Sequence, residues 1–265
     1  MLKILQSLSL AGGKQNIDLV RATGDCILVL DGSTPLVKSA YDASRFTVDF
    51  ADAFFERVGR GESIPSAIST ALSDVFELFK REVTDGAADT YPSACLLVAY
   101  MCEGRLHIIN IGDTAALIVL KDKSVKTVTC SDVPYFDGMV IERAKQIRKE
   151  SGADICDVMK LPEIKRMLID NRRRMNKSDG YRILAFGMSD VDEGEIMSFD
   201  VRDIDRVVLH SDGFDGYAKE LTAEDADLEK IYALLRAKEN ADASLNADPR
   251  FKISDDASAV VFTIE

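Results

Sequence analysis

The stretch ACLLVAYMCEGRLHIINIGDTAALIVL, residues 94–120, decides the fold of this chain. It contains three apolar runs that are typical of β-strands, separated by CEG (102–104) and IGDT (111–114). The strands that it predicts are 94–101, 105–111 and 115–120. Because links this short join only antiparallel neighbours, and parallel strands need a long crossover, the stretch predicts consecutive antiparallel strands.

Further strands and helices follow on both sides of this stretch. The other predicted strands are 2–11, 24–30, 125–130, 181–186, 195–199, 205–211 and 257–264. The predicted helices are 42–58, 63–83 with Ser63 as N-cap, most of the charged stretch 131–180, and 223–237. Runs of antiparallel strands interrupted by helix pairs favour a layered α+β sandwich over alternating βαβ units.

The composition is that of an ordinary globular protein, with 265 residues, 46% of them hydrophobic and 29% charged. We find no linker and no internal repeat, so we expect a single domain over 1–265. A net charge of −12 argues against a nucleic acid or an anionic membrane as partner. The first apolar stretch is interrupted by Gln6 and Ser7, which is more typical of a strand than of a signal peptide. Five widely spaced cysteines form no disulfide framework, so we expect a cytoplasmic protein.

Acidic residues stand at the ends of four predicted strands. Asp31 follows ILVL, Asp113 follows HIINIG, Asp212 follows RVVLHS, and Asp255 precedes ASAVVF. A glycine adjoins the aspartate in three of these places, which lets backbone or a ligand approach closely. Hard divalent cations prefer oxygen ligands, and Mg²⁺ or Mn²⁺ sites combine carboxylates, a carbonyl and water. Each of these motifs is weak alone, but four in one domain indicate a site for divalent cations.

In the order and spacing of these motifs, the sequence resembles the type 2C metal-dependent serine/threonine protein phosphatases, especially compact bacterial members. The matching segments are NID (16–18), ILVLDGST (27–34), IINIGDTAALIVL (109–120), VVLHSDGFDG (207–216) and SDDASAVVF (254–262). The resemblance covers nearly the whole chain. It implies a four-layer α-β-β-α sandwich of two antiparallel sheets flanked by helix pairs, in agreement with the predicted element order.

The resemblance also implies metal ligands. By position in the motifs, Asp31 would bridge two ions and Gly32 would offer its carbonyl oxygen to one of them. Asp212 and Asp255 would complete the other site, and Asp113 would help to hold a weaker third ion.

The implied reaction is hydrolysis of phosphoserine and phosphothreonine in proteins, as part of signalling. Two Mn²⁺ or Mg²⁺ ions, with a third in some members, would lower the pKa of a water that attacks phosphorus. They would also neutralise charge on the phosphoryl oxygens in the transition state. By the same resemblance Asp18 would orient the water and, with Asp31, be catalytic, and a phosphorylated protein would be the partner.

The sequence departs from the family pattern at several positions. Ile17 replaces a glutamate that many members have, so a second ion has one carboxylate fewer. Ser33 stands where many members have a histidine, a candidate general acid. The phosphate-binding arginine near the N-terminus has no match in register; Lys14, one residue out of register, is the nearest candidate for binding substrate.

Two alternative functions remain open. A non-catalytic binding module on the same fold fits the departures at Ile17 and at the missing arginine, whereas the complete aspartate set favours an enzyme. A phosphomonoesterase for small metabolites is the second alternative. A haloacid dehalogenase-type phosphatase is excluded, because Val29 stands where its nucleophilic aspartate would be.

Two further features are more simply structural. His210 is predicted to be a packed strand histidine rather than a ligand or an acid. A basic cluster, Arg172, Arg173, Arg174 and Lys177, reads first as a solvated helix face and second as a contact for a phosphorylated or acidic substrate.

Overall fold

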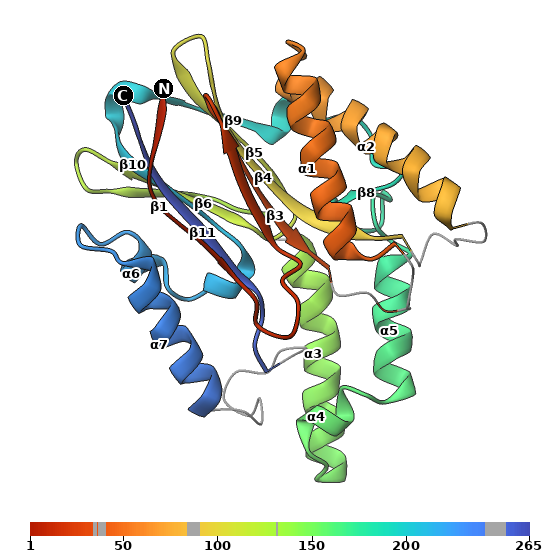
Figure 1. The fold of residues 1–265 in the computed structure, drawn as a ribbon. Coiled ribbons are helices and arrows are strands. Elements are labelled where there is room, and N and C mark those ends of the chain that lie inside the picture. Colours follow the sequence, from red (N-terminus) through yellow and green to blue (C-terminus); the bar gives the residue numbers. More distant parts are fainter. Residues whose placement is uncertain (34–35, 37–40, 84–90, 131, 242–252) are drawn as a thin grey trace.

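The computed structural model describes residues 1–33, 36, 41–83, 91–130, 132–241 and 253–265. Two antiparallel sheets lie face to face, with helices on both outer sides (Figure 1). This confirms the predicted α+β sandwich. None of the helices in these ranges is both long and apolar enough to cross a membrane.

The first sheet has five strands and contains both ends of the chain (Figure 1). In spatial order its strands are β1 (Leu2–Leu10), β11 (Ala257–Ile264), β10 (Ile204–His210), β6 (Ala115–Leu120) and β7 (Val125–Val128). Every neighbouring pair is antiparallel. The N-terminal strand and the C-terminal strand therefore pair directly, although the paired residues are 247 to 262 positions apart in the sequence, from Leu10 with Ala257 to Leu2 with Ile264.

The second sheet holds the strands that precede and follow the helix pair of the N-terminal half. In spatial order they are β2 (Leu19–Thr23), β3 (Cys26–Gly32), β4 (Ser93–Cys102), β5 (Arg105–Ile111) and β9 (Ile196–Asp200), with β8 (Leu184–Ala185) paired to β4. All of these pairs are antiparallel too. The sequence stretch that predicts three consecutive strands thus supplies two to this sheet and one, β6, to the other. The expected pairing of 105–111 with 115–120 is therefore wrong, because the chain crosses from one sheet to the other at 112–114.

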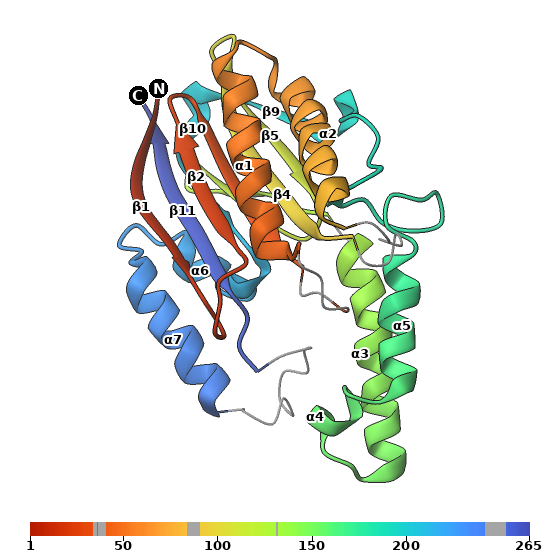
Figure 2. The same ribbon diagram turned by 45° about the vertical axis from the view of Figure 1, so that its right-hand side comes forward.

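Helices cover the outer face of each sheet (Figures 1 and 2). On the second sheet they are α1 (Ala43–Gly59) and α2 (Ile64–Glu82), and on the first α6 (Ala218–Leu221) and α7 (Leu228–Ala241). As predicted, Ser63 caps α2, where its hydroxyl accepts a hydrogen bond from the backbone N–H of Ser66 at 3.4 Å.

The central strand β4 is buried on both faces, which explains its unbroken apolar sequence. Leu96 and Val98 pack toward α1 and α2, whereas Leu97 and Ala99 pack into the core between the sheets. Alternate residues of a strand point to opposite faces, so one run of apolar residues serves two cores.

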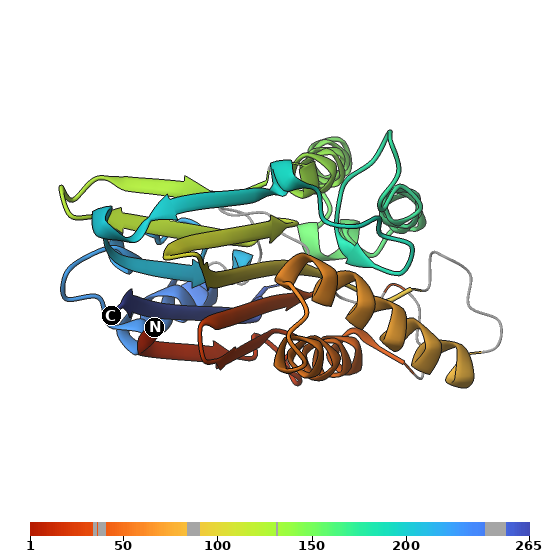
Figure 3. The ribbon, with the colours of Figure 1, turned by 90° about the horizontal axis from the view of Figure 1, so that it is seen from above.

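A helical segment that lies between β7 and β8 in the sequence forms a third unit of structure. It consists of α3 (Asp132–Ser151), α4 (Ile155–Val158) and α5 (Pro162–Arg172). Figure 3 shows α3 and α5 beyond the ends of the strands rather than over a sheet face. These helices have a small core of their own, made of Val140, Ala144, Ile155, Val158 and Ile164. Single-turn 3₁₀ helices occur at Glu193–Glu195, Val201–Asp203 and Asp212–Phe214.

The structure differs from the predictions at three elements. The short strand β2 was not predicted. The predicted strand 181–186 is reduced to two residues, since Tyr181 pairs with Met175 in an isolated bridge and Arg182 turns to Glu195. The predicted helix 223–237 begins only at Leu228, because the side chain of Asp227 accepts a hydrogen bond from the backbone N–H of Lys230 and caps the helix there.

Candidate active site

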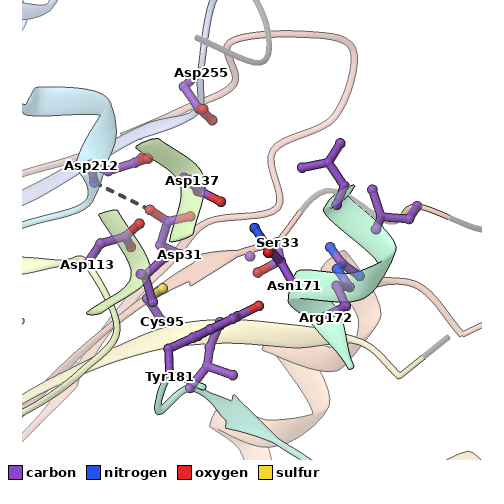
Figure 4. A pocket seen from close by; sticks show the side chains of 15 residues that line it. Asp31, Ser33, Cys95, Asp113, Asp137, Asn171, Arg172, Tyr181, Asp212 and Asp255 are labelled. Atoms are coloured by element: carbon purple, nitrogen blue, oxygen red, sulfur yellow. Dashed lines mark hydrogen bonds between the residues drawn. The ribbon is translucent and has the colours of Figure 1, made fainter. Parts of the chain in front are cut away.

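The four acidic residues at strand ends line one cavity of about 300 Å³ (Figure 4). Asp31 lies at the end of β3, Asp113 follows β5, Asp212 follows β10 and Asp255 precedes β11. Gly32 lines the same cavity. Five of the seven sequence-predicted site residues are thus brought together, although they are spread over more than 200 positions of the sequence.

The sheet topology explains this convergence. Strands β3 and β5 both run antiparallel to β4, so their C-termini lie at the same end of the second sheet. Strands β10 and β11 are antiparallel to each other, so the end of β10 lies beside the start of β11. The strand ends of the two sheets meet at the cavity, where the backbone N–H of Asp212 donates to Oδ2 of Asp31 at 3.4 Å (Figure 4).

Gly32 is required at its position by the close approach of another segment. A Cβ atom at residue 32 would lie 2.5 Å from the carbonyl oxygen of Ile17, which belongs to the backbone and cannot move aside cheaply. The same carbonyl oxygen accepts a hydrogen bond from Thr47 Oγ1 at 3.3 Å. The absence of a side chain at Gly32 therefore allows the loop before β2 to pack against the cavity edge.

Gly112 positions Asp113. Its φ of +107° is one that residues with a side chain rarely adopt, and a Cβ there would lie 2.4 Å from Sγ of Cys95. We expect Gly112→Ala to lower the free energy of unfolding by roughly 1–3 kcal/mol, measured by urea denaturation in a chelator. The control is Gly138→Ala in α3, where a Cβ meets nothing within 4 Å and alanine favours the helix by about 1 kcal/mol. Equal midpoints for the two variants would contradict this account of Gly112.

The carboxyl groups of the cavity raise one another's pKa values. Burial, followed by the charge of Asp212, raises the pKa of Asp31 well above its usual value. Burial, followed by the charge of Asp255, does the same for Asp212. Burial also raises the pKa of Asp113. Such a cluster is unfavourable as a set of anions, and positive charge placed among the carboxylates would relieve the repulsion.

Asp18 is not among the described residues that line the cavity, although its charge acts on Asp31. It is buried, and the hydroxyl of Ser211 donates to its Oδ2 at 2.8 Å. The same Ser211 oxygen accepts from the backbone N–H of Ser258 at 3.0 Å, so Asp18 connects the start of β2 to the ends of β10 and β11. Burial raises the pKa of Asp18 to about 7, against the opposing effect of the Ser211 hydrogen bond. Asp18 thus belongs to the hydrogen bonds that join the strand ends next to the acidic residues of the cavity.

The structure places Lys14 differently from the other predicted residues. Lys14 is exposed in the segment between β1 and β2, and it is not among the described residues that line the cavity. That segment is held by Asp256, whose carboxylate accepts from the backbone N–H groups of Gly12 at 2.8 Å and Ile17 at 2.7 Å. His210 is buried, as predicted for a packed strand histidine.

Sequence reasoning did not place in the site the cavity residues that come from the helical segment and from the stretch that follows it. They are Val133, Asp137, Leu168, Asn171, Arg172, Tyr181 and Ile183. Cys95 of β4 also lines the cavity. Nothing in the local pattern around Asp137 marks it, because it lies in a helix that is charged along much of its length. Arg172 was noted only as one of four neighbouring basic residues.

The donor set fits a small divalent cation. Among the described residues, no three acidic, histidine or cysteine side chains are already arranged as the shell of one ion. Mg²⁺ and similar ions need fewer, because they take one or two carboxylates and complete their shell with water and substrate oxygens. Asp31, Asp212, Asp255 and Asp113 supply such carboxylates around one cavity, and Gly32 contributes backbone there.

Comparison with known proteins agrees with this geometry. The sequence model of the protein phosphatase 2C family matches residues 17–247. No curated protein matches the chain significantly.

Solved structures of bacterial phosphatases share the fold. The PPM Ser-Thr phosphatase MsPP from Mycobacterium smegmatis, solved with cacodylate, is 16% identical at a TM-score of 0.53, covering 99% of this chain and 100% of its own. The serine/threonine phosphatase PstP/Ppp from Mycobacterium tuberculosis is 15% identical at 0.55, covering 100% and 99%. The catalytic domain of PstP in complex with 2 manganese ions is 14% identical at 0.53, covering 99% and 99%. At these identities the likeness shows the fold alone.

Proposed function

The chain belongs to the protein phosphatase 2C family, and we propose that it hydrolyses phosphoserine and phosphothreonine esters in proteins with the help of Mn²⁺ or Mg²⁺ ions. The observation that carries this proposal is the convergence of Asp31, Asp113, Asp212 and Asp255 on one cavity. The binding of 2 manganese ions by the PstP catalytic domain supports the choice of ion.

Each cavity residue has a role in this proposal. Asp31 and the backbone carbonyl of Gly32 would help to hold two cations, Asp212 and Asp255 would hold one of the pair, and Asp113 would be available to a third. When bound, these ions would supply an acidified water and positive charge for the phosphoryl oxygens.

The chain's own residues would orient the attacking water and keep bulk water out of the cavity. Asp18 is kept in place by Ser211, and its carboxyl group is available to orient water at the cavity. Val133, Leu168 and Ile183 give the cavity apolar walls, which limit the access of bulk water and strengthen electrostatic interactions inside. We propose the cytoplasm as the place of action, since the cysteines of the described part, Cys26, Cys95, Cys102 and Cys130, are free thiols.

Metal-dependent hydrolysis is the direct test. We expect p-nitrophenyl phosphate and a phosphothreonine peptide to be hydrolysed with Mn²⁺, no hydrolysis in excess EDTA, and recovery when Mn²⁺ is returned, because the carboxylates alone repel a phosphate dianion. Phosphate release is measured for both substrates and for a sugar phosphate of equal concentration.

The outcomes separate the alternatives. Preference for the sugar phosphate over the peptide would favour a small-molecule phosphomonoesterase. Tight Mn²⁺ binding without turnover of any substrate would favour a non-catalytic binding module. Hydrolysis that persists unchanged in EDTA would contradict the proposed function.

A further inference from the structure

The basic cluster at the end of α5, Arg172, Arg173, Arg174 and Lys177, does not form one surface in the folded protein. Arg173 is exposed and pairs with Asp170 at 3.4 Å. Arg174 is exposed, with its guanidinium 5.8 Å from the centre of the Phe136 ring, and Lys177 is exposed as well. Arg172 differs from all three, because it is half-buried and lines the cavity of the aspartates (Figure 4).

The cavity gives Arg172 an unusual electrostatic setting. Among the described lining residues the acids are Asp31, Asp113, Asp137, Asp212 and Asp255, and Arg172 is the sole lysine or arginine. Burial lowers the pKa of its guanidinium, while Tyr181 and the charge of Asp137 act in the opposite direction. An arginine nevertheless remains protonated in proteins, so a positive charge stays at this wall of the cavity.

The support around Arg172 is well ordered by hydrogen bonds. Its neighbour Asn171 donates from Nδ2 to the backbone carbonyl of Phe136 at 3.0 Å, which ties the end of α5 to α3. The loop that follows is closed by the backbone N–H of Asn176, which donates to the carbonyl of Tyr181 at 2.8 Å. The Asn176 side-chain oxygen also accepts from the backbone N–H of Ile183 at 3.0 Å. Arg172 thus projects from a braced helix end.

A phosphate monoester entering this cavity needs a positively charged anchor, and Lys14, the candidate from the N-terminal region, is exposed and is not among the described residues that line the cavity. Guanidinium is suited to this task because its fork of N–H donors matches two phosphate oxygens. We propose that Arg172 binds the phosphoryl oxygens of the substrate, so that the α3–α5 segment supplies the phosphate anchor from the opposite side of the cavity. This inference rests on the proposed function.

Binding of inorganic phosphate tests the inference without requiring turnover. Calorimetry or ³¹P NMR on the Mg²⁺-loaded protein should give a Kd for phosphate that rises about 10–100-fold in Arg172→Ala, as expected for the loss of charge-assisted hydrogen bonds. Arg172→Lys should recover part of this loss, because it keeps the charge but not the fork. Arg173→Ala, at the residue directly after the end of α5, is the matched control, and its Kd for phosphate should stay within twofold of the wild type.

Kinetics and metal binding give the second readout. With p-nitrophenyl phosphate we expect Arg172→Ala to raise KM, and Mn²⁺ affinity measured by EPR not to fall, since a cation has been removed from an acidic cavity. Arg172→Gln, which keeps most of the side-chain length, replaces Arg172→Ala if circular dichroism shows that the alanine variant is unfolded.

The results distinguish this inference from the proposed function. Phosphate binding that depends on Arg172 in a protein without hydrolysis would support the anchor and remove the proposed function. Hydrolysis by the wild type, with a phosphate Kd that is the same in Arg172→Ala, would overturn the anchor and leave the proposed function standing. A wild-type protein that binds no phosphate at all would also overturn the anchor.

Discussion

Asp31→Asn and Asp212→Asn are each expected to reduce kcat for a phosphothreonine peptide by about 10²–10³-fold, the scale seen when one preorganised electrostatic group is removed from an active site. Both residues line the cavity and are joined through the backbone N–H of Asp212 and Oδ2 of Asp31. An amide is a neutral and weaker ligand for a hard cation than a carboxylate. The measurement is steady-state turnover over a range of Mn²⁺ concentrations.

A loss of activity through unfolding would look the same, so stability is measured beside turnover. In EDTA both variants should be more stable than the wild type, because burial and neighbouring carboxylates raise the pKa values of Asp31 and Asp212 in the folded protein, whereas an amide carries no charge that burial and repulsion would penalise. Asp179→Asn, which removes an exposed charge in the loop after α5, is the control for both measurements. Near-native turnover of either variant at saturating Mn²⁺ would show that the site assignment is wrong.

In the absence of metal, we expect the contribution of Asp18 to stability to disappear as the pH rises from about 4 to about 8. Its pKa is raised to about 7 in the folded protein, mainly by burial, and is about 3.9 in an unfolded chain. The folded state therefore holds the proton more tightly than the unfolded state. The resulting loss of stability, up to about 4 kcal/mol, builds up between the unfolded pKa and the folded pKa and is complete once the pH has passed the folded pKa.

The test compares the pH dependence of the free energy of unfolding for the wild type and Asp18→Asn in EDTA. The two curves should run in parallel below about pH 4 and then diverge in favour of the variant up to about pH 8. The comparison is differential because other acids act in the opposite direction in both proteins, such as Asp200, whose pKa is lowered by hydrogen bonds from Arg202. Curves that stay parallel across this range would contradict the raised pKa of Asp18.

Much of the fold followed from local patterns. The apolar run of β4 with its short link to β5 predicted antiparallel pairing, and Ser63 marked the start of α2, because hydrophobic periodicity and capping act over a few residues. The start of α7 was predicted too early because the capping side chain of Asp227 was overlooked. The edge strand β2 was missed because its five residues, four partly buried and one exposed, do not alternate between buried and exposed positions.

The aspartates of the cavity could be found from the sequence for a different reason. Each stands at the end of a strongly apolar strand, so its position in the fold is encoded by its immediate neighbours. Asp137 and Arg172 have no such marker. Their approach to the cavity depends on how the α3–α5 segment packs at the ends of the strands, through contacts such as Asn171 with Phe136 that are far apart in sequence.

The amino-acid sequence by itself determined the strands, the main helices, the layered class and the acidic residues at the strand ends, because these follow from periodicity and from residues next to one another. Only the tertiary structure decided that Asp18 is held by Ser211, that Lys14 is not among the described lining residues of the cavity, and that one of the four residues of the basic cluster lines it. The burial of a side chain and the electric field at a site depend on segments that are distant in sequence. Both are therefore established only when the sheets and the helical segment pack together.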